Sequence, residues 1–275
     1  MKPFLKWPGG KRWFVAKYAH LLPPHFGRYI EPFLGSGSVF FHLAPPNALL
    51  GDLNSDLIAT YIAVREDPDA VEEKLFEHEL NHSHDYYYAL RDASPRSDIH
   101  RAARFIYLNR TCFNGIFRVN LAGTFNVPKG TKNTVIFDDD DFVAQSKVLR
   151  NAEICAIDFE PLIDRATEGD LVFADPPYTV RHNSNAFIKY NETLFSWRDQ
   201  ERLAKALARA RSKGAHIVAT NANHEAVKAL YRDLGFVLKT VSRFSSISAS
   251  SQSRSQFEEL VAQSTADCSN VEVDT

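Results

Sequence analysis

One eight-residue stretch, residues 171–178 with the sequence L-V-F-A-D-P-P-Y, limits the possible folds of this chain more than any other. Its first four residues are apolar or small and include two strong strand formers, and the two prolines that follow impose a rigid turn. The stretch therefore predicts a buried strand with Asp175 at its carboxyl end. In an open α/β sheet, ligands bind at this edge.

The four residues after this strand favour one kind of ligand. An ionised Asp175 only accepts hydrogen bonds, and Pro176 and Pro177 offer backbone carbonyls without N–H donors. Such a site suits a planar group with an exocyclic NH2, whose nitrogen lone pair stays free to attack an electrophile. Tyr178 offers a face on which a base could stack. A helix-capping Asp followed by a Pro-Pro turn and a core Tyr explains these four residues equally well.

Length and composition set broad limits. A chain of 275 residues can form one large α/β domain, or a domain with a sizeable insertion. Three widely spaced cysteines, Cys112, Cys155 and Cys268, lack metal-ligand spacing, so we expect reduced thiols in a cytoplasmic protein and no structural zinc. No signal peptide or membrane-spanning stretch is predicted. Because the net charge is only -2, binding to nucleic acid would require a local basic patch.

Two loops in the N-terminal part suit a nucleotide-like cofactor. Residues 6–11, K-W-P-G-G-K, form a loop in which backbone N–H groups could approach an anionic group while Trp7 covers a ring; a simple N-terminal turn is the alternative. A strand at residues 28–33 then leads through Gly35-x-Gly37 into an apolar helix. In this arrangement a backbone can approach a cofactor closely.

Asp52 follows a second predicted strand at residues 48–51. A carboxylate there could accept both hydroxyls of a ribose, which is the role of the acid after the second strand in dinucleotide folds. The alternative is an N-cap or Asx turn with Asn54 and Ser55, before a helix predicted at residues 57–64. The spacing after the glycines favours the ribose.

Residues 59–149 depart from the α/β pattern on either side. Helical periodicity continues to Tyr107, and turn signals at 114–115 and 122–123 then predict a hairpin. Six arginines with interleaved aromatic rings predict a DNA-binding patch, although a solvated helix face explains the first four nearly as well. These arginines are Arg91, Arg96, Arg101, Arg104, Arg110 and Arg118. The acidic run at residues 138–141 is expected to be solvated.

The α/β pattern returns in the second half of the chain. Strands are expected at residues 153–157, 171–174, 216–220 and 236–241, and helices at residues 197–212 and 225–234. The loop at residues 179–190 is long for a connection and is a candidate lid. The Ser-rich residues 242–255 are expected to form a mobile hairpin tip or a polar contact loop, and the residues beyond 263 a disordered tail.

Five short motifs follow one another over most of the chain. They are K-W-P-G-G-K at 6–11, E-P-F-L-G-S-G-S at 31–38, G-D-L-N-S-D-L at 51–57, F-N-G-I-F-R-V-N with F-N-V-P at 113–128, and D-P-P-Y at 175–178. With these motifs the sequence resembles the Dam-type DNA adenine methyltransferases, which transfer a methyl group from S-adenosylmethionine to the exocyclic amine of adenine. The resemblance implies an α/β fold with a Rossmann-like methyltransferase sheet, interrupted by a mainly helical target-recognition insert that carries a β-hairpin. The implied boundaries are 1–57 and 150–264 for the two parts of the catalytic domain, 58–149 for the insert and 265–275 for a tail.

The resemblance also implies roles for individual residues. The catalytic group around a flipped adenine would be Asp175, Pro176, Pro177 and Tyr178. The cofactor pocket would be lined by Trp7, Lys11, Glu31, Phe33, Gly35, Gly37, Asp52 and Asp175. DNA would be contacted by Lys6, Phe113, Asn114, Ile116, Arg118, Asn120 and Pro128, with Phe113 and Asn114 entering the base stack. Phe113 stands where a tyrosine is common in the family, and the Ser-rich loop has fewer basic residues than expected.

We therefore expect a monomeric, cytoplasmic enzyme that methylates adenine N6 directly from S-adenosylmethionine, in duplex DNA at GATC and without a metal. Two alternatives stay open: a methyltransferase that acts on RNA adenine or a protein amide, and a DNA-binding regulator that has lost catalysis. The intact D-P-P-Y motif opposes the second alternative. A nicotinamide dehydrogenase is disfavoured because Gly37 is not followed by the third spaced glycine.

Overall fold

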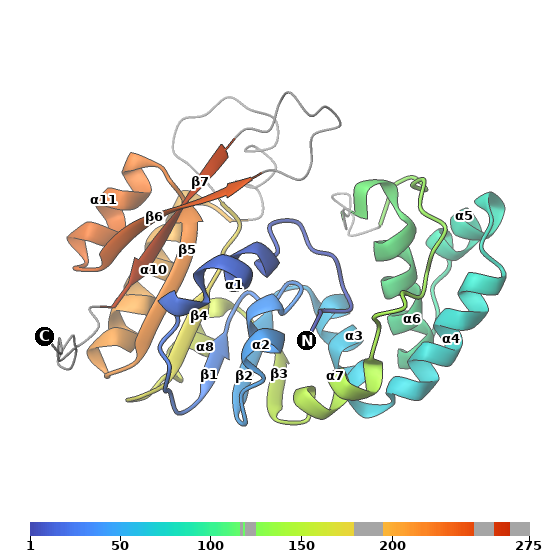
Figure 1. Ribbon diagram of the computed structural model, residues 1–275, viewed down its shortest axis with the longest axis horizontal. Helices are drawn as coiled ribbons and strands as arrows, with labels where there is room; N and C mark the ends of the chain where they lie inside the picture. The colour runs from blue at the N-terminus through green and yellow to red at the C-terminus, as the bar shows by residue number, and fades with distance from the viewer. Residues whose placement is uncertain (116–117, 119–124, 179–194, 245–255, 265–275) are drawn as a thin grey trace, which may run out of the picture. The chain divides into compact units, whose positions relative to one another are not determined.

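The computed structural model describes residues 1–115, 118, 125–178, 195–244 and 256–264. Figure 1 shows it as a ribbon coloured from blue at the N-terminus to red at the C-terminus. Packing divides the chain into two compact units. Unit 1 comprises Met1–Ala19 and Leu34–Asp158, and unit 2 comprises His20–Phe33 and Phe159–Thr275. Because this division follows packing alone, the functional boundaries expected at residues 57 and 149 stay a prediction.

The predicted α/β class is confirmed, with a mixed sheet in which the described strands follow the order β3-β2-β1-β4-β5-β7-β6. The strands are β1 (Tyr29–Glu31), β2 (Ala48–Asp52), β3 (Ala152–Ala156), β4 (Leu171–Ala174), β5 (His216–Ala222), β6 (Val237–Phe244) and β7 (Gln256–Gln263). β2 is parallel to β3, and β4 is parallel to both β1 and β5, whereas β7 is antiparallel to β5 and β6. In unit 2 the carboxyl ends of β1, β4 and β5 therefore meet at one edge, where α/β folds bind ligands.

Helices make up most of unit 1. They are α1 (Arg12–Tyr18), α2 (Ser38–Leu43), α3 (Ser55–Glu66), α4 (Pro68–Leu80), α5 (His84–Asp92), α6 (Asp98–Thr111) and α7 (Phe142–Leu149), with a 3-10 turn at Phe113–Gly115. The side chains of Asn54, Asp67, Ser83 and Ser97 each accept an N–H of the following helix and so fix where α3 to α6 begin. In Figure 1 these helices, coloured cyan to green, lie side by side, and α6 packs against α3 and α4. The helical periodicity expected up to Tyr107 is confirmed, whereas an inserted recognition domain stays a prediction.

The core of unit 1 contains an ion pair that the sequence did not suggest. Arg110 is 1% exposed, pairs with Asp140 and donates to the backbone oxygens of Phe4 and Val135. A buried charge needs such a complete set of partners, because an unpaired one is very costly. The prediction that Arg110 contributes to a DNA-binding patch is therefore wrong. In the acidic run, Asp138, Asp139 and Asp141 are exposed as predicted, whereas the Asp140 side chain is buried in this ion pair.

Three other arginines of the predicted patch are also bonded within the fold. Arg104 is half-buried and donates from Nε to the carbonyl of Leu90 at 2.7 Å. Arg101 pairs with Asp98, and Arg91 pairs with Asp92. Arg101 is exposed and so fits the alternative of a solvated helix face, whereas Arg91 and Arg104 are half-buried.

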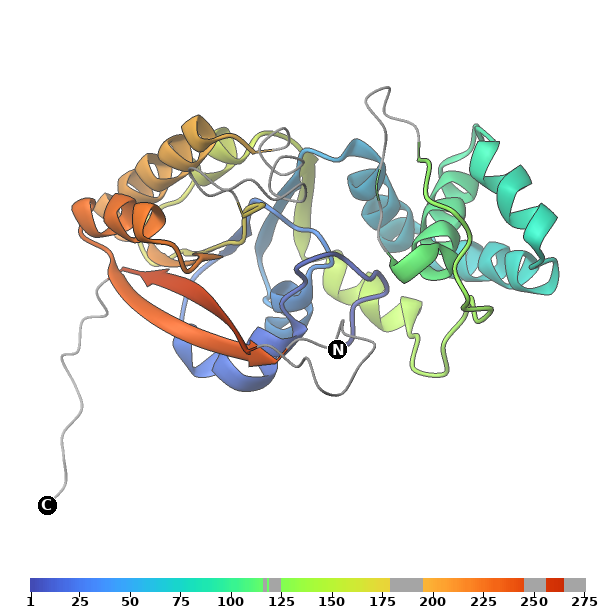
Figure 2. The ribbon, with the colours of Figure 1, turned by 90° about the horizontal axis from the view of Figure 1, so that it is seen from above.

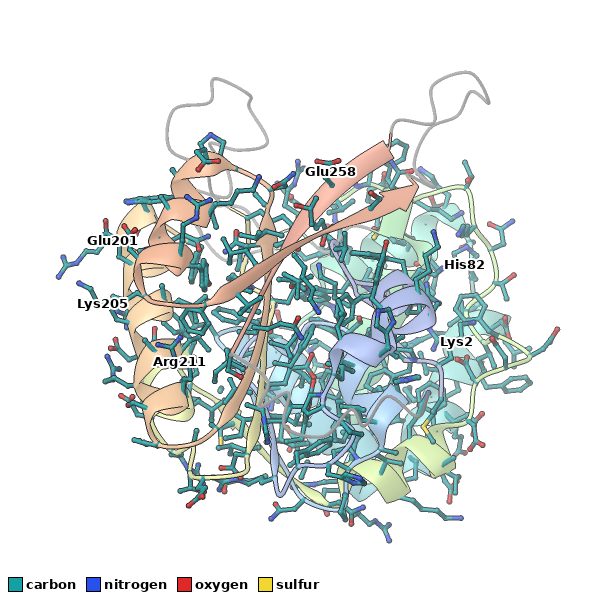
Figure 3. The ribbon with its side chains drawn as sticks, turned by 60° about the vertical axis from the view of Figure 1, so that its left-hand side comes forward. Lys2, His82, Glu201, Lys205, Arg211 and Glu258 are labelled. Carbon is teal, nitrogen blue, oxygen red and sulfur yellow. The ribbon has the colours of Figure 1, made fainter. Side chains whose placement is uncertain are left out.

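Unit 2 combines strands β1 and β4 to β7 with helices of different lengths. Its helices include α8 (Phe159–Ile163), which the sequence did not predict, α10 (Trp197–Ser212) and α11 (Glu225–Asp233). Figure 3 shows Glu201, Lys205 and Arg211 among the side chains of α10, and its capping box, formed by Ser196 and Asp199, is confirmed. In Figure 2, β6 and β7 run side by side over their whole length. The strand predicted to end at residue 241 thus continues to Phe244, and β7 was not predicted.

Several expectations fall on residues outside the described part of the chain. These are the lid at 179–190, all but the first three residues of the Ser-rich loop at 242–255, and the tail beyond Ser264. Most of the hairpin predicted after residue 113 also lies outside, and the described residues give one antiparallel bridge there, between Cys112 and Lys129. None of the helices that the structure describes is long and apolar enough to cross a membrane.

Candidate active site

The glycine turn of unit 1 is shaped by the absence of side chains. Gly35 and Gly37 have positive φ angles of +46° and +62°, which favour glycine. A Cβ atom at Gly35 would lie 2.8 Å from Cδ1 of Trp7, so this ring packs directly on the turn. The hydroxyl of Tyr61 donates to the carbonyl of Gly35 at 3.0 Å and fixes the turn from its other side.

Asp52 connects this turn to the end of β2. Its Oδ2 accepts the N–H of Gly35 at 3.1 Å, and its Oδ1 accepts the N–H of Asn54 at 2.9 Å. The Asx turn considered from the sequence is therefore present, while the N-cap of α3 is Asn54 itself. Burial raises the pKa of Asp52, and the backbone hydrogen bonds oppose this rise. Because each carboxylate oxygen can accept a second hydrogen bond, these contacts are compatible with a ribose.

The N-terminal loop of unit 1 brings two predicted cofactor residues against aromatic rings. Trp7 stacks on Phe105 with ring centroids 6.4 Å apart. Lys11 is 4% exposed, donates to the carbonyl of Gly9 at 3.0 Å and lies 5.9 Å from the centre of the Trp13 ring. A buried ammonium group close to a loop backbone is suited to an anionic ligand group.

Four of the predicted DNA contacts lie close together in unit 1. The N–H of Phe113 donates to the carbonyl of Pro128 at 2.9 Å, and Asn114 has a left-handed φ of +57°. A Cβ on the next residue, Gly115, would lie 3.5 Å from Cδ of Lys6. The Phe113 side chain is 53% exposed.

Lys6 is the best anchored residue of this group. Its backbone N–H donates to the Asn109 side chain at 2.9 Å, and its carbonyl accepts from the same side chain at 2.7 Å. Its ammonium group lies 4.7 Å from the centre of the Phe137 ring. Burial and repulsion from Lys132 lower the pKa of Lys6 to about 8. Arg118 is exposed, and Ile116 and Asn120 lie outside the described residues.

In unit 2, Asp175 follows β4 directly, as predicted. The hydroxyl of Thr220 on β5 donates to Oδ1 of Asp175 at 2.6 Å, and the Thr220 side chain is fully buried. The carbonyl of Pro177 accepts from Nε2 of Gln200 at 3.4 Å, and the Gln200 side chain accepts in turn from Asn221 at 2.8 Å. The motif is thus fixed by side chains of β5 and α10.

Tyr178 is bonded to an acid that sequence reasoning missed. Its hydroxyl donates to Oε2 of Glu259 on β7 at 2.6 Å, and Glu259 is 3% exposed. Burial and the neighbouring carboxylates raise the pKa of Tyr178 far above its ordinary value, so the hydroxyl stays protonated. An acid directly before the apolar residues L-V-A would have been the sequence signal, and β7 itself was not predicted.

The two other predicted cofactor residues of unit 2 belong to its packed interior. Glu31 is 3% exposed and accepts the hydroxyl of Tyr29 at 2.9 Å. Burial and the charge of Glu31 raise the pKa of Tyr29 far above its ordinary value. Phe33 is half-buried and stacks on Phe159 with centroids 5.4 Å apart.

Comparison with known proteins identifies the family of this chain. The family model described as D12 class N6 adenine-specific DNA methyltransferase matches residues 7–247. The chain belongs to the D12 class of adenine-specific DNA methyltransferases. A Type II methyltransferase of Lactococcus lactis subsp. cremoris is 35% identical over 95% of this chain and 94% of its own length. The DNA adenine methylase of Serratia marcescens is 36% identical over 82% of this chain and 84% of its own length.

Membership of the D12 class settles the general activity: this protein is an adenine-specific DNA N6-methyltransferase. It also confirms the family resemblance seen in the five motifs. The matched range includes the glycine turn of unit 1 and the D-P-P-Y motif of unit 2. Among the described residues of this D12-class chain, no group of three or more His, Cys, Asp or Glu side chains is arranged to hold a metal ion.

Proposed function

We propose that this D12-class enzyme uses S-adenosylmethionine to methylate N6 of an adenine that is flipped out of duplex DNA, within the sequence GATC. The observation that carries the proposal is Asp175 at the end of β4, with one carboxylate oxygen fixed by the buried hydroxyl of Thr220. A carboxylate with a fixed orientation can align the lone pair of a planar amine, which a mobile one cannot.

The residues of unit 1 fit S-adenosylmethionine. Because Gly35 has no side chain, the Trp7 ring packs directly on the glycine turn, and we assign this ring to the wall of the adenosine pocket. Asp52 has acceptor capacity left for the ribose hydroxyls, and the buried ammonium of Lys11 suits the carboxylate of the methionine part. S-adenosylmethionine supplies a methyl group on a positively charged sulfonium when it is bound. Glu31, Phe33 and Gly37 complete the set of cofactor contacts that the family resemblance implies.

The residues of unit 2 fit the exocyclic amine of adenine. We assign its two N–H groups to Asp175 and to the carbonyl of Pro176, because the Pro177 carbonyl already accepts from Gln200. The adenine ring would stack on Tyr178, which contributes about 1 to 3 kcal/mol against the few kcal/mol that flipping costs. Transfer then requires the nitrogen to come within about 3 to 3.5 Å of the methyl carbon.

Unit 1 offers a compact group of residues for reading DNA. The exposed ring of Phe113 is suited to fill the space that a flipped base leaves, and Lys6, Asn114, Arg118 and Pro128 surround or follow it in the chain. Because several predicted patch arginines are bonded within the fold, recognition depends on these residues together with Ile116 and Asn120, by analogy with the family. We assign Arg118 to one guanine, so Arg118→Ala should lower discrimination at that base by about 1 to 3 kcal/mol.

A methyl-transfer assay with defined duplexes tests the proposal. The purified enzyme and labelled S-adenosylmethionine are incubated with a duplex that contains one GATC site and with a second duplex in which its adenine is replaced. We expect label only in the first duplex, and resistance of that duplex to nucleases that cut unmethylated GATC. Label in duplexes without GATC would overturn the assigned sequence, whereas label in single-stranded RNA but not in duplex DNA would overturn the substrate.

A further inference from the structure

The acid that contacts Tyr178 lies at an unusual position in the sheet. Glu259 belongs to β7, which pairs with β5 on one side and with β6 on the other. Its neighbour Glu258 is exposed and accepts from the Asn223 side chain at 2.6 Å, and Figure 3 shows it at the surface of β7. Two adjacent acids on one strand therefore have opposite environments, one in solvent and one in the interior.

The pairing register places Glu259 on the same face of the sheet as Thr220. Ala222 of β5 is opposite Glu259, and Thr220 is opposite Val261, so residues 220, 222, 259 and 261 share one face. The Thr220 hydroxyl on this face contacts Asp175, and the Glu259 carboxylate contacts Tyr178. The acid and the aromatic ring of the D-P-P-Y motif are thus each bonded from the same face by a different strand.

Burial of a carboxylate seldom increases the stability of a fold, because the cost of removing it from water offsets the interactions it gains. Removing a charge from water is expensive, and a buried ionic group is often replaced by an apolar one without loss of stability. A protonated tyrosine hydroxyl that donates to a carboxylate forms one of the stronger hydrogen bonds in proteins and fixes the ring in one orientation. The Glu259 contact therefore has a better explanation in the orientation of Tyr178 than in stability.

We propose that Glu259 is a positioning residue for methyl transfer, which orients the Tyr178 ring through its hydroxyl and so aligns the adenine that stacks on it. The inference rests on the proposed role of Tyr178 and adds a residue from β7 that lies outside all five sequence motifs. Glu259 contacts neither the base nor the cofactor in this proposal, and its effect reaches the reaction only through the tyrosine.

The test uses Glu259→Gln, which keeps the size of the side chain and removes its charge. The control is Glu258→Gln, the same change one residue away on the exposed side of β7. Single-turnover rate constants of methyl transfer are measured on a duplex that the wild-type enzyme methylates. We expect Glu259→Gln to lower the rate constant by about threefold to tenfold, because the neutral amide oxygen of Gln accepts a weaker hydrogen bond from Tyr178 than a carboxylate does. The control should keep the wild-type rate constant, and the dissociation constants for DNA and S-adenosylmethionine should change by less than about twofold.

A double-mutant cycle separates positioning from a general structural effect. Tyr178→Phe removes the hydrogen bond altogether and should lower the rate constant at least as far as Glu259→Gln does. If Glu259 acts through the tyrosine hydroxyl, adding Glu259→Gln to Tyr178→Phe should cause no further loss. Losses that multiply, or a wild-type rate in Glu259→Gln, would overturn the inference while the methyltransferase activity stands.

Two other outcomes are equally informative. If Glu259→Gln does not fold, Tyr178→Phe alone decides the matter, since a wild-type rate in that variant would overturn the inference. If the wild-type enzyme transfers no methyl group to DNA, the proposed function fails and the role of Glu259 fails with it.

Discussion

The two units of this molecule each place an aspartate at the end of a parallel strand, and the two carboxylates are used differently. In unit 1, both carboxylate oxygens of Asp52 accept hydrogen bonds from backbone N–H groups, those of Gly35 and Asn54. Asp175 of unit 2 is bonded to a side chain, the hydroxyl of Thr220. The first carboxylate therefore shapes the loop around it, whereas the second is itself held in position.

This difference indicates what each acid can contribute. A carboxylate that accepts two backbone N–H groups determines the shape of a glycine turn, so its removal should affect both the fold and any ligand that the turn contacts. A carboxylate that is oriented by a side chain can be removed with less damage to the backbone. We therefore expect Asp52 to act on binding and stability together, and Asp175 to act on the chemical step.

The largest effect is expected for Asp175→Ala. Without the carboxylate, the adenine amine loses the acceptor that aligns its lone pair, and the rate constant of methyl transfer should fall by more than about a hundredfold. Duplex DNA binding, measured by fluorescence anisotropy, should survive. Asp233→Ala, which removes an exposed acid at the end of α11, is the control and should behave as wild type. Retained turnover in Asp175→Ala would remove the basis of the proposed mechanism.

Asp52→Ala should produce a smaller but broader loss. It leaves the N–H groups of Gly35 and Asn54 without their acceptor, at a cost of about 1 to 3 kcal/mol for each that stays buried. We expect a lower melting temperature and an affinity for S-adenosylmethionine that is reduced roughly tenfold or more, as for a lost hydrogen bond to a charged group. Calorimetric titration and thermal unfolding measure the two effects. A lower melting temperature with unchanged affinity would restrict Asp52 to the Asx turn.

Thr220→Val should sharpen the comparison, because it removes one hydrogen-bond partner of Asp175 and leaves Asp175 itself in place. Valine has nearly the same shape as threonine and lacks the hydroxyl that donates to Oδ1 of Asp175. The rate constant should fall by roughly threefold to tenfold, the value of one hydrogen bond, with little change in the Michaelis constant for DNA. Thr220→Ser, which keeps the hydroxyl, should restore most of the rate. Equal rate constants of methyl transfer for Thr220→Val and Thr220→Ser would mean that this contact does not orient Asp175.

The parts of the fold that were predicted are those with local signals. The strand before Asp175 ends at two prolines, and helix α10 begins at a capping box, so both were found with their observed bounds. Strand β7 was missed because Q-F-E-E-L-V-A-Q does not alternate: Glu258 is exposed, but Leu260 and Ala262 on the same face are buried. Two buried faces are typical of a strand in a sheet that is covered on both faces, and no local pattern reports what covers them.

The same distinction applies to the candidate site. Asp175 and Tyr178 were found from the motif itself, whereas Thr220 and Glu259 approach them from 45 and 81 residues away in the chain. Arg110 shows the opposite error, since its charge and aromatic neighbours in the sequence predicted DNA binding although it is buried against Asp140. Sequence spacing identifies groups with the right chemistry, but only tertiary packing decides which of them reach solvent.

The smallest expected effect concerns pH and again separates the two acids. Burial raises the pKa of Asp52 above its ordinary 3.8, so ionisation of this group opposes folding. Asp52 therefore contributes to the stability of the native state at low pH, and this contribution is lost as pH rises through the raised pKa. Cofactor binding should respond in the opposite direction, because ribose hydroxyls donate to the carboxylate. The affinity for S-adenosylmethionine should therefore weaken as pH falls toward the raised pKa of Asp52, at a pH where an ordinary Asp is still ionised.

Titrating the dissociation constant from about pH 8 down to about pH 4 checks this, because ordinary aspartates titrate only at the lower end of that range. Asp52→Asn provides the comparison, since it keeps the shape and one acceptor oxygen but cannot titrate. Its dissociation constant should be higher than that of wild type at neutral pH and should show no Asp52-dependent change on acidification. If wild type and Asp52→Asn weakened in parallel, the titrating group would lie elsewhere, and Asp52 would shape the turn without contributing its charge to the ligand.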